Sequence, residues 1–149
     1  MSCLPQGIKV KVRPSVMEDV QPIADNMREE DRAEVKASHG HLPEQALISG
    51  LNDPLCECYT VTTKGKPIAM FGCSQSPFPH LAGVWFLSTN ETKQHIRDFL
   101  TLPPKFFKRW FETYPNLFNI VDKRNKASLR WLKRLGFKVI GESTQWTNE

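Results

Sequence analysis

The segment comprising residues 117–141 constrains the fold more than any other part of the sequence. Its apolar start, residues 117–121, is typical of a buried strand, and Asn125 then precedes a helix with three leucines at helical spacing. Gly136 favours the left-handed conformation that ends a helix, and residues 137–141 return as a strand. A strand, a helix and a strand in so few residues indicate either a crossover unit or part of an α+β sheet.

The N-terminal part predicts one strand followed by helices. Residues 8–13 alternate strictly between apolar and polar types, which indicates a half-buried strand. Asp19 is in position to cap a helix, because Pro22 falls in the first turn of that helix. A second helix over residues 28–35 is charged almost all round, and a third is expected to begin at Pro43.

The middle of the chain changes to strands. Residues 56–63 and 67–73 predict the two strands of a hairpin, with the turn between them. The continuous apolar run at residues 84–87 is typical of a strand buried on both faces. Two further helices are expected, one capped by Asn90 and one over residues 104–114. This element order predicts one α+β domain.

Composition limits the classes of protein. A chain of 149 residues is long enough for one ordinary core, and it holds no apolar run near the ~20 residues of a membrane span. We therefore expect a soluble intracellular protein without a membrane contact. Twenty basic and sixteen acidic residues give a net charge of +4, which suits an anionic cofactor or partner. This excess is too small for a typical nucleic-acid-binding protein.

Four cysteines raise the question of zinc or disulfides. Cys56 and Cys58 have a spacing that is unusual for a zinc site, and the sequence has no second pair of Cys or His residues at a zinc-site spacing to complete a set of four ligands. We expect no metal and reduced thiols, with Cys56 and Cys58 on one face of a strand.

Three segments carry a resemblance to a known superfamily. Residues 125–137, an Asn followed by a helix that ends in Leu-Gly-Phe, resemble the C-terminal motif of the GNAT N-acetyltransferases. Residues 8–19 resemble their first strand and helix start, and residues 65–72 resemble their turn and third strand. The resemblance implies a single GNAT-like domain over residues 1–149, with a mixed, mostly antiparallel central sheet flanked by helices. It also implies transfer of an acetyl group from acetyl-CoA to an amine.

Three further segments resemble a small family encoded by tailed phages and prophages. They are residues 26–35, the pattern Trp85-x-x-x-Thr89, and residues 119–125. Members of that family are described as acetyltransferase-like proteins or as internal virion proteins. This resemblance implies the cytoplasm of a bacterial host, or the virion, as the location. It implies host proteins or virion proteins as partners.

The GNAT resemblance also implies a cofactor site. In those enzymes the backbone of the fourth strand bonds the pantetheine arm, and a glycine-rich loop after it holds the pyrophosphate. Residues 88–96 contain no glycine, so this stretch is either a modified phosphate site or an ordinary capped helix start. The candidate cofactor contacts are Phe86, Leu87, Ser88, Thr89, Asn90, Lys93, Asn125, Ser128 and Trp131.

Candidate catalytic residues come from two places. Glu30 and Glu34 lie four apart on one helical face, where they either attract and deprotonate a cationic amine or form a solvated surface. The family often has a tyrosine as general acid at a position where this chain has Leu132. Tyr114 is the candidate substitute for that acid, and the alternative for Tyr114 is a core or rim position.

Charge is distributed unevenly along the chain. Basic residues gather at residues 123–134, and acidic residues gather at residues 29–34. The basic cluster suits the 3′-phosphate of coenzyme A, DNA, an acidic protein or solvent. Two functional hypotheses follow: an acetyl-CoA-dependent N-acetyltransferase, or a catalytically degenerate GNAT fold that serves as a virion component or binds a host protein. DNA binding ranks below both.

Overall fold

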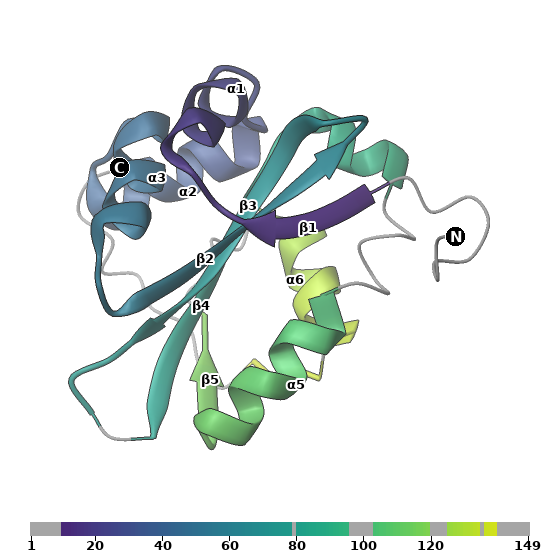
Figure 1. Cartoon of the computed structure of the whole chain (residues 1–149). Helices are drawn as coiled ribbons and strands as arrows, with labels where there is room; N and C mark the ends of the chain where they lie inside the picture. Colours follow the sequence, from purple (N-terminus) through teal and green to yellow (C-terminus); the bar gives the residue numbers. More distant parts are fainter. Residues whose placement is uncertain (1–9, 79, 96–102, 120–124, 135, 140–149) are drawn as a thin grey trace.

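The sheet at the centre of the protein has five strands in the order β1-β2-β3-β4-β5. The computed structural model describes residues 10–78, 80–95, 103–119, 125–134 and 136–139. In Figure 1, α1, α2 and α3 lie together on one side of the sheet, and α5 and α6 lie together on the other. The predicted α+β class, with a mixed sheet between helices, is confirmed.

Along the chain, the first strand is followed by three α-helices, then by three strands, and finally by helices and one short strand. The strands are β1 (Val10–Pro14), β2 (Cys56–Thr63), β3 (Lys66–Gln75), β4 (Leu81–Ser88) and β5 (Asn116–Phe118). The α-helices are α1 (Val20–Asp25), α2 (Glu29–His39), α3 (Pro43–Asn52), α5 (Pro103–Thr113) and α6 (Lys126–Arg134). Two 3₁₀ helices are η1 (Met17–Asp19) and η2 (Asn90–His95). No helix among these is long and apolar enough to cross a membrane.

The sheet is antiparallel except at one edge. The pairs β1–β2, β2–β3 and β3–β4 are antiparallel, and the β2–β3 pair is the hairpin predicted for residues 56–73. β4 pairs with β5 in parallel, and that ladder covers only Leu81–Gly83 of β4 opposite Asn116–Phe118. β4 continues to Ser88, so its last five residues extend beyond the described pairing with β5.

Alternation along the strands gives each face of the sheet its own core. Phe71 and Trp110 belong to the core on the α5 side. Met70 packs with Ile23 and Leu47 on the side of α1 and α3. Because successive side chains of a strand point to opposite faces, Met70 and Phe71 serve different cores.

Two predicted elements differ from the structure. Asn90 begins a 3₁₀ helix, η2, where an α-helix was expected, and the continuation at residues 96–102 lies outside the described residues. Residues 137–139 form no strand. The reason is local: Gly136 has a φ of 100°, and the Phe137 N–H donates to the Leu132 carbonyl at the end of α6.

Asp19 directly precedes α1, as predicted, but its side chain makes a tertiary contact. Its carboxylate accepts hydrogen bonds from Arg13 at 2.7 and 2.8 Å, from the Val16 N–H at 2.9 Å and from the Thr60 hydroxyl at 2.8 Å. Burial raises the pKa of the Asp19 carboxyl, but the hydrogen bonds from Arg13, Val16 and Thr60 outweigh burial and hold that pKa below its ordinary value.

This lowered pKa predicts how stability depends on pH. A depressed carboxyl pKa stabilises the fold above the unfolded value near ~4, and that stabilisation is lost as the pH falls through the folded value. We expect Asp19→Asn to destabilise the protein by about 1–3 kcal/mol at pH 7 and by progressively less below about pH 4. Urea unfolding of both proteins from pH 7 to pH 2 measures this difference. A difference that stays constant over the whole range contradicts the assignment.

Candidate functional site

The open end of β4 is the centre of the candidate site. Ser88 is the last residue of this strand, and its N–H and C=O both face away from β3. Backbone groups alternate sides along a strand, so those of Phe86 face the same way as those of Ser88. Those of Leu87 face its partner Met70 in β3. Phe86 and Ser88 therefore lie on the edge of β4 beyond its described pairing with β5.

The start of α2 covers the Ser88 end of this edge. The Ser88 N–H donates to the Asp31 carboxylate at 2.9 Å, and the Ser88 carbonyl accepts from the Arg28 N–H at 2.9 Å. The Ser88 hydroxyl also donates to Asp31 at 3.2 Å. Met27, just before Arg28, forms a bridge with Thr89, which brings the start of α2 against the end of β4.

Arg28 and Asp31 form a buried ion pair at this position. The guanidinium donates to the two carboxylate oxygens at 2.9 and 3.1 Å, and the residues are 5% and 1% exposed. Their spacing of three residues at the start of a helix places both on one face. Removing charges from water is costly, so such a pair is stable only when hydrogen bonds satisfy its remaining atoms.

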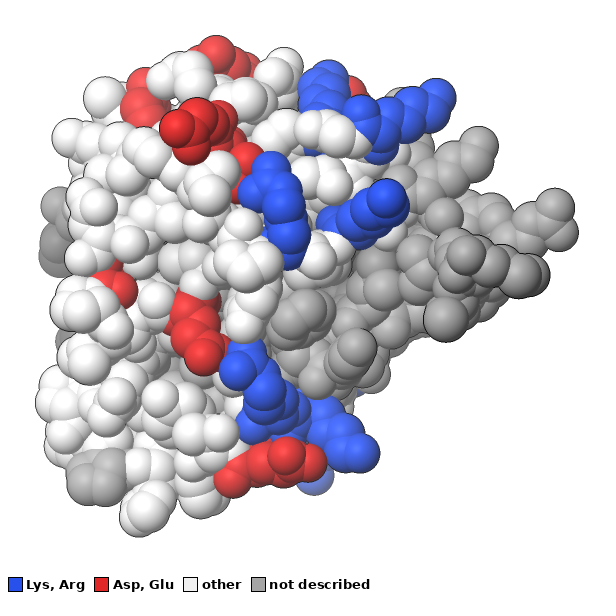
Figure 2. Space-filling view, viewed as in Figure 1, with Lys and Arg blue, Asp and Glu red and all other residues white. Residues whose placement is uncertain are grey.

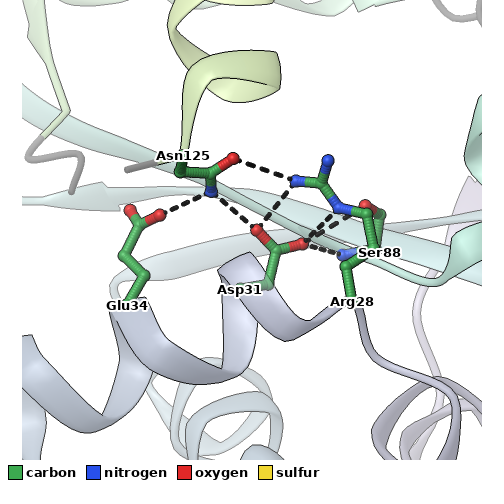
Figure 3. Close-up of polar contacts among 5 residues, drawn as sticks. All are labelled: Arg28, Asp31, Glu34, Ser88 and Asn125. Carbon is green, nitrogen blue, oxygen red and sulfur yellow. Dashed lines mark hydrogen bonds and ion pairs between the residues drawn. The ribbon is translucent and has the colours of Figure 1, made fainter. Parts of the chain in front are cut away.

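Asn125 supplies further hydrogen bonds from the other end of the chain. Figure 3 shows its amide between α2 and the start of α6: the NH₂ group donates to Asp31 at 2.9 Å and to Glu34 at 2.8 Å. Its carbonyl oxygen lies 3.4 Å from a nitrogen of Arg28. Asn125 is 1% exposed, whereas Glu34 is partly buried. We call these five residues, Arg28, Asp31, Glu34, Ser88 and Asn125, the clamp.

An open hollow of about 410 Å³ lies beside the clamp. Its lining mixes acidic, basic and amide side chains, and the exposed pair of Lys66 and Glu91 contributes to it. Thr89 and Asn90 also line this hollow. The Thr89 N–H and hydroxyl both donate to the Ile68 carbonyl, each at 2.9 Å, which fixes the start of the segment after β4.

The outer surface of β1 and α5 carries mixed charge. Figure 2 shows Lys and Arg side chains over both elements, with Asp and Glu side chains close to those over α5. One such contact joins Arg109 and Glu57 at 2.9 Å. Over α5, therefore, the described basic residues lie beside acidic ones.

The structure brings together three residues that the sequence identified separately: Glu34, Ser88 and Asn125. Phe86 and Leu87 are in β4, Thr89 and Asn90 line the hollow, and Glu30 is in the first turn of α2. Tyr114 packs against the core that contains Phe71, on the α5 side of the sheet. Lys93 is in η2, and Ser128 and Trp131 are in α6, but their side chains lie outside the described part of the structure.

Sequence reasoning missed the pairing of Arg28 with Asp31. The sequence places both residues in a helix charged almost all round, a pattern that predicts a solvated surface. The available signal was their spacing of three residues directly after a buried apolar stripe that ends at Met27. The contact of this pair with Asn125 spans more than 90 positions, and no local pattern encodes it.

Comparison of the sequence with protein-family models finds no match, and comparison with curated proteins finds none either. Solved structures do match. A GCN5-related N-acetyltransferase from Kribbella flavida aligns with a TM-score of 0.69 and 22% identity over 89% of this chain and 84% of that chain. A Streptococcus mutans protein gives a TM-score of 0.66 and 18% identity over 88% and 85%.

An N-acetyltransferase of known target also matches. The ribosomal-protein-S18-alanine N-acetyltransferase of Escherichia coli gives a TM-score of 0.61 and 14% identity, over 87% of this chain and 77% of that chain. Identities at this level establish the fold alone. The strand order, the parallel contact of β4 with β5 and these alignments agree: the chain has the fold of the GNAT N-acetyltransferases.

Proposed function

We propose that the protein is an acetyl-CoA-dependent N-acetyltransferase that acts on an amine of a protein or small molecule. The observation that carries the proposal is the arrangement at the end of β4: among the described residues, β4 pairs in parallel with β5 at Leu81–Gly83 and continues to Ser88. In the GNAT enzymes that the sequence resembles, the backbone of this strand binds the pantetheine arm. The N-acetyltransferases among the structural matches share this fold.

Acidic residues beside this edge suit the amine acceptor. Glu34 is partly buried, and Asn125 holds its carboxylate through a hydrogen bond of 2.8 Å. A positioned carboxylate attracts a cationic amine and accepts a proton from it. Glu30 is four residues earlier on the same helix and adds negative charge on that face. Acetyl-CoA would supply the acetyl group.

The clamp limits how the cofactor fits. The N–H and C=O of Ser88 are both bonded to Arg28 and Asp31, and the Thr89 N–H is bonded to Ile68. These groups can serve a cofactor only after their present partners have moved. Phe86 faces the same side of β4, two residues before Ser88. Cofactor binding is therefore proposed for the β4 edge without a direct bond to Ser88 in this conformation.

The same contacts favour a second candidate function. The N–H and C=O of Ser88 already form hydrogen bonds within the protein, so this strand end needs no ligand to complete them. In addition, the buried residue Leu132 occupies the position at which the family often has a tyrosine that acts as general acid. Under this alternative, the chain is a non-catalytic GNAT fold. It serves as an internal virion component or binds a host protein in the bacterial cytoplasm.

Glu34→Gln tests the enzymatic proposal, because glutamine keeps the acceptor for Asn125 but cannot take a proton. With acetyl-CoA and a panel of amines that includes polyamines and lysine peptides, we expect release of coenzyme A by the unmodified protein. We expect kcat/KM to fall by about 10²–10⁴ in Glu34→Gln. Glu18→Gln, which changes an exposed carboxylate on η1, is the matched control and should leave turnover unchanged.

A calorimetric titration separates the two candidates. Heat of binding with acetyl-CoA below about 1 mM supports the enzyme, and no heat together with no thermal shift at that concentration contradicts it. Detection of the chain in purified phage particles by mass spectrometry, or specific capture of a host protein from bacterial lysate, supports the second candidate. Turnover with an amine contradicts it.

A further inference from the structure

Two cysteines lie side by side at the start of β2, on the side of α3 and away from the clamp. Cys56 and Cys58 are two residues apart, so their side chains share one face of the strand, as the sequence predicted. Their sulfur atoms are 3.6 Å apart, and both residues are partly buried free thiols. Cys73, on the neighbouring strand, is a fully buried free thiol.

Hydrogen-bond donors converge on the sulfur of Cys56. The indole N–H of Trp85 donates to it at 3.4 Å, and Cys58 lies within hydrogen-bond distance. The Ser74 side chain, opposite Cys56 in the β2–β3 ladder, adds a third hydrogen bond. A sulfur that receives several donors is stabilised as a thiolate, which is the reactive form of cysteine.

Close packing holds the Trp85 donor in place. The indole lies against two glycines, and a Cβ atom built on Gly72 or Gly50 would come within 2.7 or 2.8 Å of the ring. Any larger residue at Gly72 would displace the ring. The sequence therefore places glycine where the indole must approach the backbone, and this approach fixes the direction of its N–H toward Cys56.

The surrounding groups shift the pKa values of the two thiols in opposite directions. The hydrogen bond from Cys58 is the main cause that lowers the pKa of Cys56 to about 6, and those from Ser74 and Trp85 add to it. Burial and the charge of Asp53, at the end of α3, act in the opposite direction. The same contact with Cys56 raises the pKa of Cys58, so Cys58 remains a thiol and the donor.

Cys73 does not compete as a reactive thiol. Burial is the main cause that raises its pKa to about 12, and the charges of Cys56 and Glu57 raise it further, against the opposite effect of Arg109. Among the cysteines that the structure describes, Cys56 alone combines partial exposure with a stabilised thiolate.

We propose that Cys56 and Cys58 form a redox-sensitive pair whose oxidant is a hydroperoxide. The Cys56 thiolate attacks the terminal oxygen of the hydroperoxide; the S–O bond forms as the O–O bond breaks. The alkoxide or hydroxide leaves and takes a proton from water. Sulfur is oxidised by two electrons to a sulfenic acid, and the peroxide is reduced. Cys58 then attacks the Cys56 sulfur and displaces water, which gives a disulfide.

The second step requires the start of β2 to bend. Residues two apart in an extended strand have Cα atoms about 6.6–6.8 Å apart, at the upper end of the range for disulfides, and their Cβ atoms are about as far apart, whereas a disulfide brings the Cβ atoms to about 3.5–4.5 Å. The sulfur atoms, now 3.6 Å apart, reach bonding distance only when this segment leaves the extended conformation. Three residues separate the end of α3 from Cys56, the first residue of β2, so the bend falls at an element boundary.

Peptide mass spectrometry after brief exposure to hydrogen peroxide tests the proposal. The peptide with both cysteines should lose two hydrogens in the unmodified protein and gain one oxygen on Cys56 in Cys58→Ser. Cys56→Ser should leave Cys58 unoxidised under the same conditions. Peptide mapping separates this pair from Cys3 and Cys73. Oxidation of Cys58 in Cys56→Ser, or of Cys73 in the unmodified protein, at the rate seen for Cys56 overturns the proposal.

Alkylation rates of the unmodified protein give a second test that does not depend on a folded variant. At pH 6.5 the thiolate fraction of Cys56 exceeds that of free cysteine by about 75-fold, and its lower basicity reduces nucleophilicity by about 13-fold. We therefore expect Cys56 to react with iodoacetamide about sixfold faster than free cysteine, with a midpoint near pH 6. Trp85→Phe removes the donor and should move that midpoint upward. A midpoint near pH 8.5 in the unmodified protein contradicts the assignment.

Discussion

Replacement of Asp31 with alanine should destabilise the protein by about 3–5 kcal/mol. The substitution removes the carboxylate that the guanidinium of Arg28, 5% exposed, contacts at 2.9 and 3.1 Å. It also removes the acceptor of the Ser88 N–H and one acceptor of the Asn125 amide. Most of the loss comes from the buried charge that remains, not from the intrinsic strength of the pair.

Two comparisons make this prediction specific. The double variant Arg28→Met/Asp31→Leu removes both charges, so we expect it to recover a large part of the stability lost by Asp31→Ala. Glu91→Gln breaks the exposed pair with Lys66 and should cost less than about 1 kcal/mol. Urea unfolding measures all three. A loss for Asp31→Ala no larger than that for Glu91→Gln contradicts a buried clamp.

Trp110→Ala should cost about 3–5 kcal/mol of unfolding free energy. Trp110 is 2% exposed, and its ring packs against Phe71 and Tyr59 with centroid distances of 6.1 and 6.2 Å. Its indole N–H donates to Glu57 at 2.6 Å. The alanine variant leaves a cavity between α5 and the sheet and removes the hydrogen bond between them.

A neighbour on the same helix provides the control for this second prediction. Phe111 is 44% exposed, so Phe111→Ala should cost less than half as much as Trp110→Ala. Trp110→Phe keeps an aromatic ring but not the N–H, so we expect an intermediate loss. Thermal and urea unfolding of the three variants should give this order. Equal losses for the two alanine variants would mean that α5 is not anchored to the sheet through Trp110.

The sequence predicts the secondary elements well where their patterns are local. β2 has the predicted bounds, because its alternation and the Lys-Gly-Lys turn after it are read directly from neighbouring residues. The expected helix at Asn90 is a 3₁₀ helix, and the expected strand after Gly136 is absent from residues 137–139. In the second case a hydrogen bond between Phe137 and Leu132 competes with strand pairing.

The candidate site is less predictable for a physical reason. Glu34, Ser88 and Asn125 were identified one by one, but the hydrogen bonds that join them connect residues 57 to 94 positions apart. Whether the charges at residues 28–34 face solvent or a buried partner depends on how α2 meets β4, which is a tertiary contact. The spacing of Glu30 and Glu34 predicts that they share one face of the helix, but it does not predict that Asp31 is buried.

A titration of the isotope-labelled protein with acetyl-CoA, followed by amide NMR, tests most directly whether the β4 edge is the cofactor site. The proposed function predicts chemical-shift changes concentrated at residues 84–88 and at Asn125, and saturation below about 1 mM. Changes confined to other parts of the sheet, or none up to that concentration, would contradict an acetyl-CoA site at this edge.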